Sequence, residues 1–246
     1  MIGFTSVTLR KYTIDEVVEA AVKAEADFIE WGSDVHIKSQ EDAHKAKRLC
    51  DENGIKITAY ATYYKIGCND LSEWKKLCEI GEILGAEYIR TWLGQKGSEE
   101  TDEKEYLALI EETKKMSDIA KQFGLIICNE CHPHTYNDTT ASSVKYLKDV
   151  SRDNVRTYYQ SWYRDEAGDR EKLFELISYV QNVHLSFSEL IKFQRFHKKD
   201  RAFIDKILSW LKELDFSGNL IIEFTKDDSV ENLVKDLKKL KSMWNK

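Results

Sequence analysis

The 246-residue sequence predicts an α/β protein built as a single (β/α)8 (TIM) barrel domain over residues 1–246. Three observations lead to this prediction. Eight short apolar runs alternate with longer segments of helical periodicity, no linker divides the chain, and such barrels commonly use about 200–250 residues as one domain. A doubly wound open sheet fits less well, because its first turn is usually rich in glycine and the segment FTSVTLRKYT contains none.

The predicted strands are short runs of apolar, β-branched and aromatic residues. In chain order they cover residues 2–7, 27–31, 55–61, 86–92, 125–130, 155–160, 180–185 and 219–224. Helices with charged outer faces are predicted between them, most clearly over residues 14–24, 71–84, 104–123 and 230–243. A strand followed by a helix, repeated eight times, is the arrangement found in a closed (β/α)8 barrel.

Local signals support these boundaries. Thr13 and Glu16 have the spacing of a capping box at the start of the first helix. Three glycines, Gly54, Gly85 and Gly124, each follow a helical run and precede a strand. A left-handed C-cap is expected at such positions, so each glycine indicates a helix end.

Composition excludes several functional classes. The formal net charge of −6 argues against the broad basic face that non-specific nucleic-acid binding needs. No stretch approaches the roughly 18 apolar residues of a membrane-spanning helix, and the first residues do not have the pattern of a signal peptide. Five scattered cysteines are an odd count, which fits reduced thiols and a cytoplasmic location better than a disulfide framework.

Polar side chains gather at the predicted strand ends. Catalytic groups of (β/α)8 barrels stand at the carboxyl ends of the strands, so these residues are the candidates for chemistry. In chain order they are Glu30 at the end of the second strand and His36 after it, Arg90 and Trp92 at the fourth, Glu130, His132 and His134 at the fifth, Gln160 at the sixth, His184 at the seventh and Glu223 at the eighth.

Three of these residues, Glu130, His184 and Glu223, suggest a metal ion. Each follows several apolar residues, where burial alone would favour valine or leucine. Two carboxylates and an imidazole at one barrel mouth need a partner that offsets their charge, and one divalent cation (Mn²⁺, Mg²⁺, Co²⁺ or Zn²⁺) suits such ligands. Taken singly, each glutamate has an alternative role in a salt bridge, and His184 has one as a hydrogen-bonded core histidine.

The predicted substrate-binding residues lie at or just past strand ends: His36, Tyr60, Arg90, Trp92, His132, Trp162 and Arg195. Aromatic rings there can stack on the C–H faces of a sugar, although they can equally fill the top of the barrel. For His132 and His134 the sequence allows two interpretations: they contact the substrate, or they lie on a solvent-exposed loop. Arg195 belongs to the basic loop IKFQRFHKKDR, which is either a phosphate site or a solvated surface.

The segments FIEWGSDVH, YATYYKIG, IRTWLG, NECHPHTYNDT, YYQSW, VHLSF and LIIEF resemble, in order, those of the sugar-phosphate isomerase/epimerase family. That family belongs to the xylose isomerase-like TIM barrels. The resemblance implies a metal centre formed by Glu130, Gln160, His184 and Glu223. Gln160 departs from the pattern, because most of the superfamily has aspartate there, and a neutral amide holds a dication less tightly.

Two further departures concern the substrate. The ketose epimerases of this group resemble one another in an arginine and a histidine that are replaced here by Leu190 and Tyr163. The resemblance therefore implies the metal centre more strongly than it implies any one sugar.

The function expected from these residues and this resemblance is that of a metal-dependent isomerase or epimerase acting on a sugar or sugar phosphate. Glu130 and Glu223 would act as the acid/base pair that moves a proton through an enediolate. The alternatives are a dehydratase acting on a polyol or inosose at the same centre, and a non-catalytic carbohydrate-binding protein on a degraded barrel. A related DNA-repair endonuclease is disfavoured by the six histidines and the negative charge. Barrels of this group commonly pair, so a homo-oligomer is possible.

Overall fold

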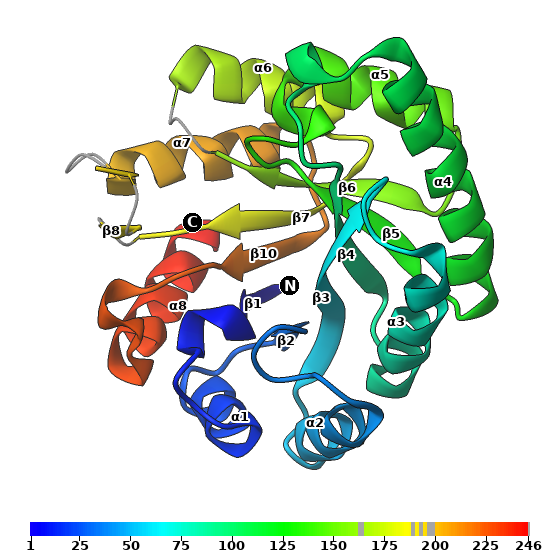
Figure 1. Cartoon of the computed structure of the whole chain (residues 1–246). Coiled ribbons are helices and arrows are strands. Elements are labelled where there is room, and N and C mark those ends of the chain that lie inside the picture. The colour runs from blue at the N-terminus through cyan, green and yellow to red at the C-terminus, as the bar shows by residue number, and fades with distance from the viewer. Residues whose placement is uncertain (162–164, 188–189, 192–193, 196–199, 246) are drawn as a thin grey trace.

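The computed structural model describes residues 1–161, 165–187, 190–191, 194–195 and 200–245. Within these residues, parallel strands close into a barrel and α-helices surround it (Figure 1). The strands follow one another around the barrel in the order β1, β10, β7, β6, β5, β4, β3 and β2. Every strand therefore pairs with the barrel strands before and after it in the chain, and the predicted (β/α)8 barrel is confirmed.

The barrel strands match the predicted runs closely. They are β1 (Ile2–Thr5), β2 (Phe28–Gly32), β3 (Lys56–Ile66), β4 (Tyr88–Leu93), β5 (Ile126–Glu130), β6 (Val155–Gln160), β7 (Val180–Leu185) and β10 (Asn219–Ile222). The described helices around them are α1 (Ile14–Lys23), α2 (Gln40–Glu52), α3 (Leu71–Leu84), α4 (Glu103–Gln122), α5 (Thr140–Val150), α6 (Glu166–Leu176), α7 (Asp200–Glu213) and α8 (Val230–Trp244).

Some predicted boundaries are wrong. The first strand ends at Thr5 because the next residues form a 3-10 helix, η1 (Ser6–Leu9). Strand β3 continues to Ile66 because its last residues pair with β4 after a shift in register. A two-stranded antiparallel sheet, β8 (Leu190–Ile191) with β9 (Gln194–Arg195), follows β7 and is not among the predicted elements. Further short 3-10 helices are η2 (Ser98–Glu100), η3 (Tyr136–Asp138) and η4 (Lys226–Asp228).

The predicted caps are present. The Thr13 side chain accepts a hydrogen bond from the Glu16 backbone, and the Glu16 carboxylate accepts one from the Thr13 backbone. The three glycines, Gly54, Gly85 and Gly124, have φ values of +68°, +65° and +68°. These left-handed conformations explain why glycine ends each helix before the chain enters the next strand.

The barrel interior consists of an apolar layer below a polar one. The apolar layer contains Phe28, Ala59, Tyr88, Cys128, Tyr158 and Ile221, all buried. Side chains two positions apart on a strand point to the same side. The residues two positions after Phe28, Tyr88, Cys128, Tyr158 and Ile221 therefore also point into the barrel, nearer its carboxyl end: Glu30, Arg90, Glu130, Gln160 and Glu223.

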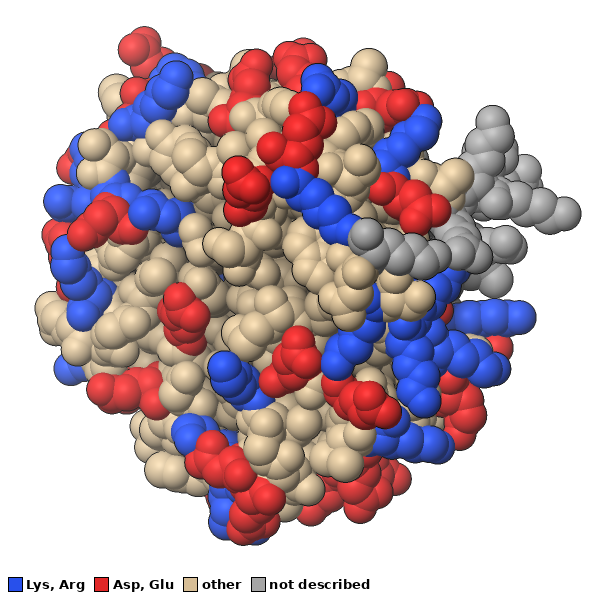
Figure 2. Space-filling view, turned by 180° about the vertical axis from the view of Figure 1, so that it is seen from behind, with Lys and Arg blue, Asp and Glu red and all other residues tan. Residues whose placement is uncertain are grey.

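The outer surface of the helices is charged. Figure 2 shows acidic and basic side chains spread together over most of one face, with Lys and Arg gathered toward one edge. Among the described residues, no helix has both the length and the apolar character needed to cross a membrane.

Gly3 of β1 lies against Phe28 of β2. A Cβ atom at Gly3 would lie 2.3 Å from the carbonyl oxygen of Phe28, well inside contact distance. Gly3→Ala is therefore expected to force the strands apart and lower the free energy of unfolding by about 3 kcal/mol, measured by urea denaturation. The control is Gly124→Ala. A Cβ atom at Gly124 would have no neighbouring atom within 4 Å, so the only cost is that of placing alanine in a left-handed conformation, about 1–2 kcal/mol. Equal losses in both variants would contradict this account.

Candidate metal centre and adjoining cavity

Glu130, His184 and Glu223 meet at the carboxyl end of the barrel. Their ligand-type atoms all lie within 4.8 Å of one another, and all three residues are buried. His184 Nδ1 is 3.4 Å from Glu223 Oε2 and 3.6 Å from Glu130 Oε1. β5, β7 and the residue that follows β10 supply these side chains. The closed barrel thus joins residues that are far apart in the sequence.

Gln160 of β6 completes the group. Its Nε2 donates a hydrogen bond of 2.8 Å to Glu223 Oε2. Its Oε1, like both ring nitrogens of His184, is buried and makes no hydrogen bond within the part of the chain that the structure describes. Buried polar atoms usually have a partner, because leaving one unsatisfied costs about 1–3 kcal/mol. The unsatisfied Gln160 oxygen and His184 nitrogens lie beside the carboxylates of Glu130 and Glu223, and this set of donor atoms fits a divalent cation.

A second set of buried polar residues lies against this group. Arg90 Nη1 is 3.4 Å from Glu30 Oε1 and 3.5 Å from Glu130 Oε2. The Tyr158 hydroxyl donates to Glu30 Oε2 over 2.6 Å. The sequence places Glu30 at a strand end without indicating its role, and sequence reasoning missed Tyr158. The signal that could have found the role of Glu30 is its place between apolar residues in FIEW, two positions after the inward-facing Phe28.

The charges of the two sets together favour a dication. The three buried carboxylates of Glu30, Glu130 and Glu223 and the one buried guanidinium of Arg90 leave two negative charges when His184 is neutral. Burial alone would lower the pKa of His184, but the surrounding carboxylates raise it, so without a metal ion the imidazole takes up a proton. A bound dication would replace that proton and balance both charges.

Glu30 is expected to make folding sensitive to acid. Burial alone would raise the pKa of the Glu30 carboxyl, but the Arg90 guanidinium and His184 hold it at about 2. Since an unfolded glutamate has a pKa of about 4.3, this ionisation stabilises the fold above that pH, and the contribution is lost as the pH falls toward 2. Urea unfolding at pH 5, 4 and 3 with a chelator present should show a shallower dependence on pH in Glu30→Gln. Equal slopes in variant and wild type would contradict this.

Trp92 and His132 line the approach to Glu130. Trp92 Nε1 donates a 2.7 Å hydrogen bond to Glu130 Oε2. The His132 ring stacks on Trp92 with the ring centres 4.5 Å apart, and His132 Nδ1 lies 2.7 Å from the Pro133 carbonyl oxygen. Both residues are among the substrate contacts that the sequence predicts. The structure adds that the Trp92 N–H holds one oxygen of Glu130 and leaves the other oxygen on the His184 side.

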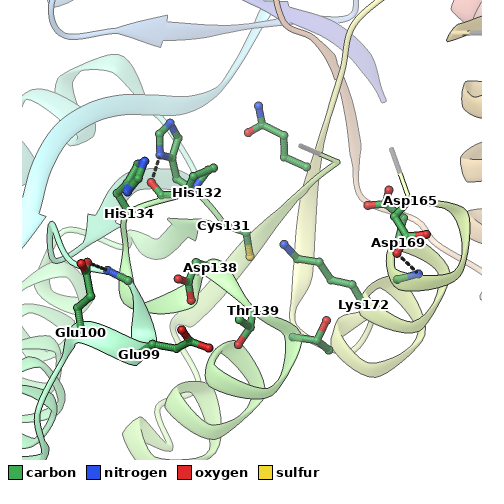
Figure 3. Close-up of a pocket in the computed structure, with 15 residues that line it drawn as sticks. Glu99, Glu100, Cys131, His132, His134, Asp138, Thr139, Asp165, Asp169 and Lys172 are labelled. Atoms are coloured by element: carbon green, nitrogen blue, oxygen red, sulfur yellow. Dashed lines mark hydrogen bonds between the residues drawn. The ribbon is translucent and has the colours of Figure 1, made fainter. Parts of the chain in front are cut away.

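A cavity of about 590 Å³ adjoins the group. Gln160, one of the candidate ligands, is among its lining residues, and so is His132. Figure 3 shows His132 and His134 at one side, Asp165 and Asp169 at another, and Lys172 extending inward from α6. Small-molecule pockets typically have volumes of about 300–1,000 Å³. The cavity is thus large enough for a monosaccharide.

Two other predicted substrate residues lie elsewhere. His36 is buried between Ser6 and Tyr12, with Nδ1 3.0 Å from the Ser6 hydroxyl and Nε2 3.0 Å from the Tyr12 carbonyl oxygen. Tyr60 is buried and donates its hydroxyl to the carbonyl oxygen of Ile37. Both residues thus have protein partners for their polar atoms, and the structure does not bring them to the metal group.

The remaining predicted contacts fall outside the described side chains. Trp162 lies outside the described residues. Arg195 lies on β9, and its side chain is outside what the structure describes. The departures at Tyr163 and Leu190 also concern side chains outside the described part.

Comparison with known proteins supports the fold and shows the family. A family model described as "xylose isomerase-like TIM barrel" matches residues 18–243. A curated 3-dehydroshikimate dehydratase from Bacillus anthracis is 23% identical over 180 residues, which are 69% of this chain and 64% of that protein. The match therefore spans less than two thirds of that relative's length.

Solved structures share the whole barrel. A probable 3-DHS dehydratase from Bacillus anthracis has a TM-score of 0.82 at 15% identity and covers 98% of each chain. A D-psicose 3-epimerase has a TM-score of 0.79 at 16% identity, covering 100% of this chain and 99% of that one. The IolI protein, solved with a bound zinc atom, has a TM-score of 0.79 at 20% identity, covering 99% and 98%. At these identities the likeness establishes the fold.

Proposed function

The chain belongs to the xylose isomerase-like TIM barrels, and from that premise we propose that it is a divalent-metal-dependent isomerase or epimerase acting on a sugar or sugar phosphate. The observation that carries the proposal is the pair of buried carboxylates, Glu130 and Glu223, which both lie near Nδ1 of His184 at the barrel mouth. Structures of an epimerase and of a zinc-binding protein with the same fold support it.

Glu130, Gln160, His184 and Glu223 would hold the metal ion. When bound, the ion supplies positive charge that polarises a substrate carbonyl and stabilises the negative charge that develops on its oxygen. Trp92 orients Glu130 through its N–H, and Gln160 orients Glu223 in the same way. Each carboxylate thus has one oxygen held by an N–H donor, which fixes its direction, and in Glu130 the same oxygen also faces Arg90.

The two glutamates would move the proton. One carboxylate accepts a proton from the carbon next to the carbonyl, and the electrons of that C–H bond move onto the carbonyl oxygen to give an enediolate. The other carboxylate, protonated, then returns a proton. Return to the opposite face of the same carbon gives the epimer, and return to the neighbouring carbon gives the aldose–ketose isomer. Glu130 ends β5 and Glu223 follows β10, so the two carboxylates can approach a substrate from different directions.

A dehydratase is the second candidate. The similarity to a 3-dehydroshikimate dehydratase favours it, both in sequence and in the structure of a probable 3-DHS dehydratase. Its first step would be the same proton abstraction. The enediolate would then expel a hydroxyl group from the adjacent carbon, which a protonated carboxylate would convert to water. The two candidates therefore differ only in the step after the first proton transfer.

The test is an exchange screen in deuterated water. The protein, loaded in turn with Mn²⁺, Co²⁺, Mg²⁺ or Zn²⁺, is incubated with free and phosphorylated ketoses, inososes and 3-dehydroshikimate, and the products are followed by NMR. Deuterium beside a carbonyl together with a new epimer or isomer supports the first proposal. An unsaturated product supports the dehydratase. Sugar binding without exchange, and independent of metal, would contradict both and favour a carbohydrate-binding protein.

A further inference from the structure

The two ring nitrogens of His184 face different carboxylates. Nδ1 lies 3.4 Å from Glu223 and 3.6 Å from Glu130, the two carboxylates of the candidate metal group. Nε2 lies 3.4 Å from Glu30 Oε1, on the other side of the ring. Nδ1 is therefore the nitrogen directed at the metal group, and Glu30 is the carboxylate opposite the remaining nitrogen.

Glu30 is itself held in place. The Tyr158 hydroxyl donates to its Oε2 over 2.6 Å, and Arg90 Nη1 approaches its Oε1 at 3.4 Å. The Tyr158 ring also packs edge-on against the His184 ring, with their centres 4.9 Å apart. Glu30 is 0% exposed and Arg90 2%. Because the residues around Glu30 are buried and bonded to it, its carboxylate has little freedom to turn away from Nε2.

We propose that Glu30 is a positioning residue that sets which nitrogen of His184 binds the metal ion. With the metal ion bound, the Glu30 carboxylate, 3.4 Å from Nε2, would accept the Nε2–H of neutral His184, and this would leave the lone pair of Nδ1 directed at Glu130 and Glu223. Tyr158 and Arg90 keep the Glu30 carboxylate oriented for this contact. The inference rests on the proposed metal site and deepens it, since it adds the residue on which the ligand geometry depends.

The physical basis is general. A histidine that binds a metal through one nitrogen usually donates its other N–H to a carboxylate or a carbonyl, which fixes the tautomer and makes the ligand nitrogen more basic. Removing such a partner typically weakens metal binding roughly 10–100-fold.

Glu30→Gln tests the inference in the zinc-loaded protein. Zinc affinity is measured by competition with a chelating dye, and long-range ¹H–¹⁵N correlation spectra report which nitrogen of His184 carries the proton. The wild type should show a proton on Nε2 and zinc on Nδ1. Glu30→Gln should bind zinc roughly 10–100-fold more weakly, with a shifted and faster-exchanging Nε2–H signal.

Glu112→Gln is the matched control. This glutamate lies on α4, outside the barrel, and its carboxylate also accepts a hydrogen bond from a tyrosine, Tyr64. It should leave both the zinc affinity and the His184 spectrum unchanged. If Glu30→Gln does not fold, Tyr158→Phe removes the anchor of Glu30 while keeping the ring, and a smaller change in the same direction is expected.

The possible results distinguish a failure of the role proposed for Glu30 from a failure of the proposed metal site. Zinc binding by Glu30→Gln as tight as that of Glu112→Gln would overturn the role of Glu30 and leave the metal site standing. A wild-type spectrum with the proton on Nδ1 would do the same. A wild type that binds none of the four dications would overturn the metal site and, with it, this inference.

Discussion

Glu223→Gln is expected to lower kcat about 10³-fold on any substrate that the exchange screen identifies. The substitution keeps the size of the side chain and leaves an amide oxygen that can still accept the Gln160 hydrogen bond. It removes the carboxylate that would accept or return the proton, and general acid–base groups typically contribute about 10²–10⁴-fold. The measurement is the initial rate at saturating metal, together with the metal content of the variant.

Two controls make this result specific. The circular dichroism spectrum and the midpoint of thermal unfolding of Glu223→Gln should match those of the wild type. Glu112→Gln, the same substitution outside the barrel, should keep the wild-type rate. A Glu223→Gln protein with wild-type turnover would remove Glu223 from the acid/base pair.

Arg90→Met is expected to cause a large loss of stability in the metal-free protein. Arg90 lies next to the buried carboxylates of Glu30 and Glu130, at 3.4 and 3.5 Å. Methionine approximates the length of the side chain but leaves both carboxylates without this partner. Breaking a buried ion pair on one side costs about 3–5 kcal/mol, so the urea midpoint should fall steeply when a chelator is present. Added Mn²⁺ should restore part of the loss by binding the folded state.

The control is an exposed ion pair on the protein surface. Arg48 pairs with Glu52 on α2 at 3.2 Å, with side chains that are 58% and 54% exposed. Arg48→Met should therefore cost less than about 1 kcal/mol, because solvent screens such pairs. If Arg90→Met and Arg48→Met lower the free energy of unfolding by similar amounts, Arg90 does not stabilise the buried carboxylates as proposed.

The strand ends are the part of the site that the sequence predicts well. Glu130, His184 and Glu223 each end an apolar run, and in a closed parallel barrel the carboxyl ends of all strands meet at one mouth. Their assembly therefore follows from the fold class alone. The same reasoning predicts that Gln160 lies beside them, and the structure pairs it with Glu223.

The contacts that could not be predicted from the sequence depend on how the strands are staggered and on how the loops between them turn. That Tyr158 reaches Glu30, 128 positions away in the chain, requires the tilt and shear of the whole barrel. The Trp92–Glu130 hydrogen bond likewise depends on the register of β4 against β5. The sequence predicts that His36 faces a substrate, but the turn after β2 carries it back against Ser6 and Tyr12. Composition and periodicity contain none of this information.

The central claim is that Glu130, Gln160, His184 and Glu223 form a functional metal centre, and metal content tests it most directly. The protein is purified without chelator or histidine tag and analysed by plasma mass spectrometry beside His184→Ala. We expect near-stoichiometric divalent metal in the wild type and its loss in the variant. A wild type that retains no metal, even after reloading with Mn²⁺, Co²⁺, Mg²⁺ or Zn²⁺, would contradict the account.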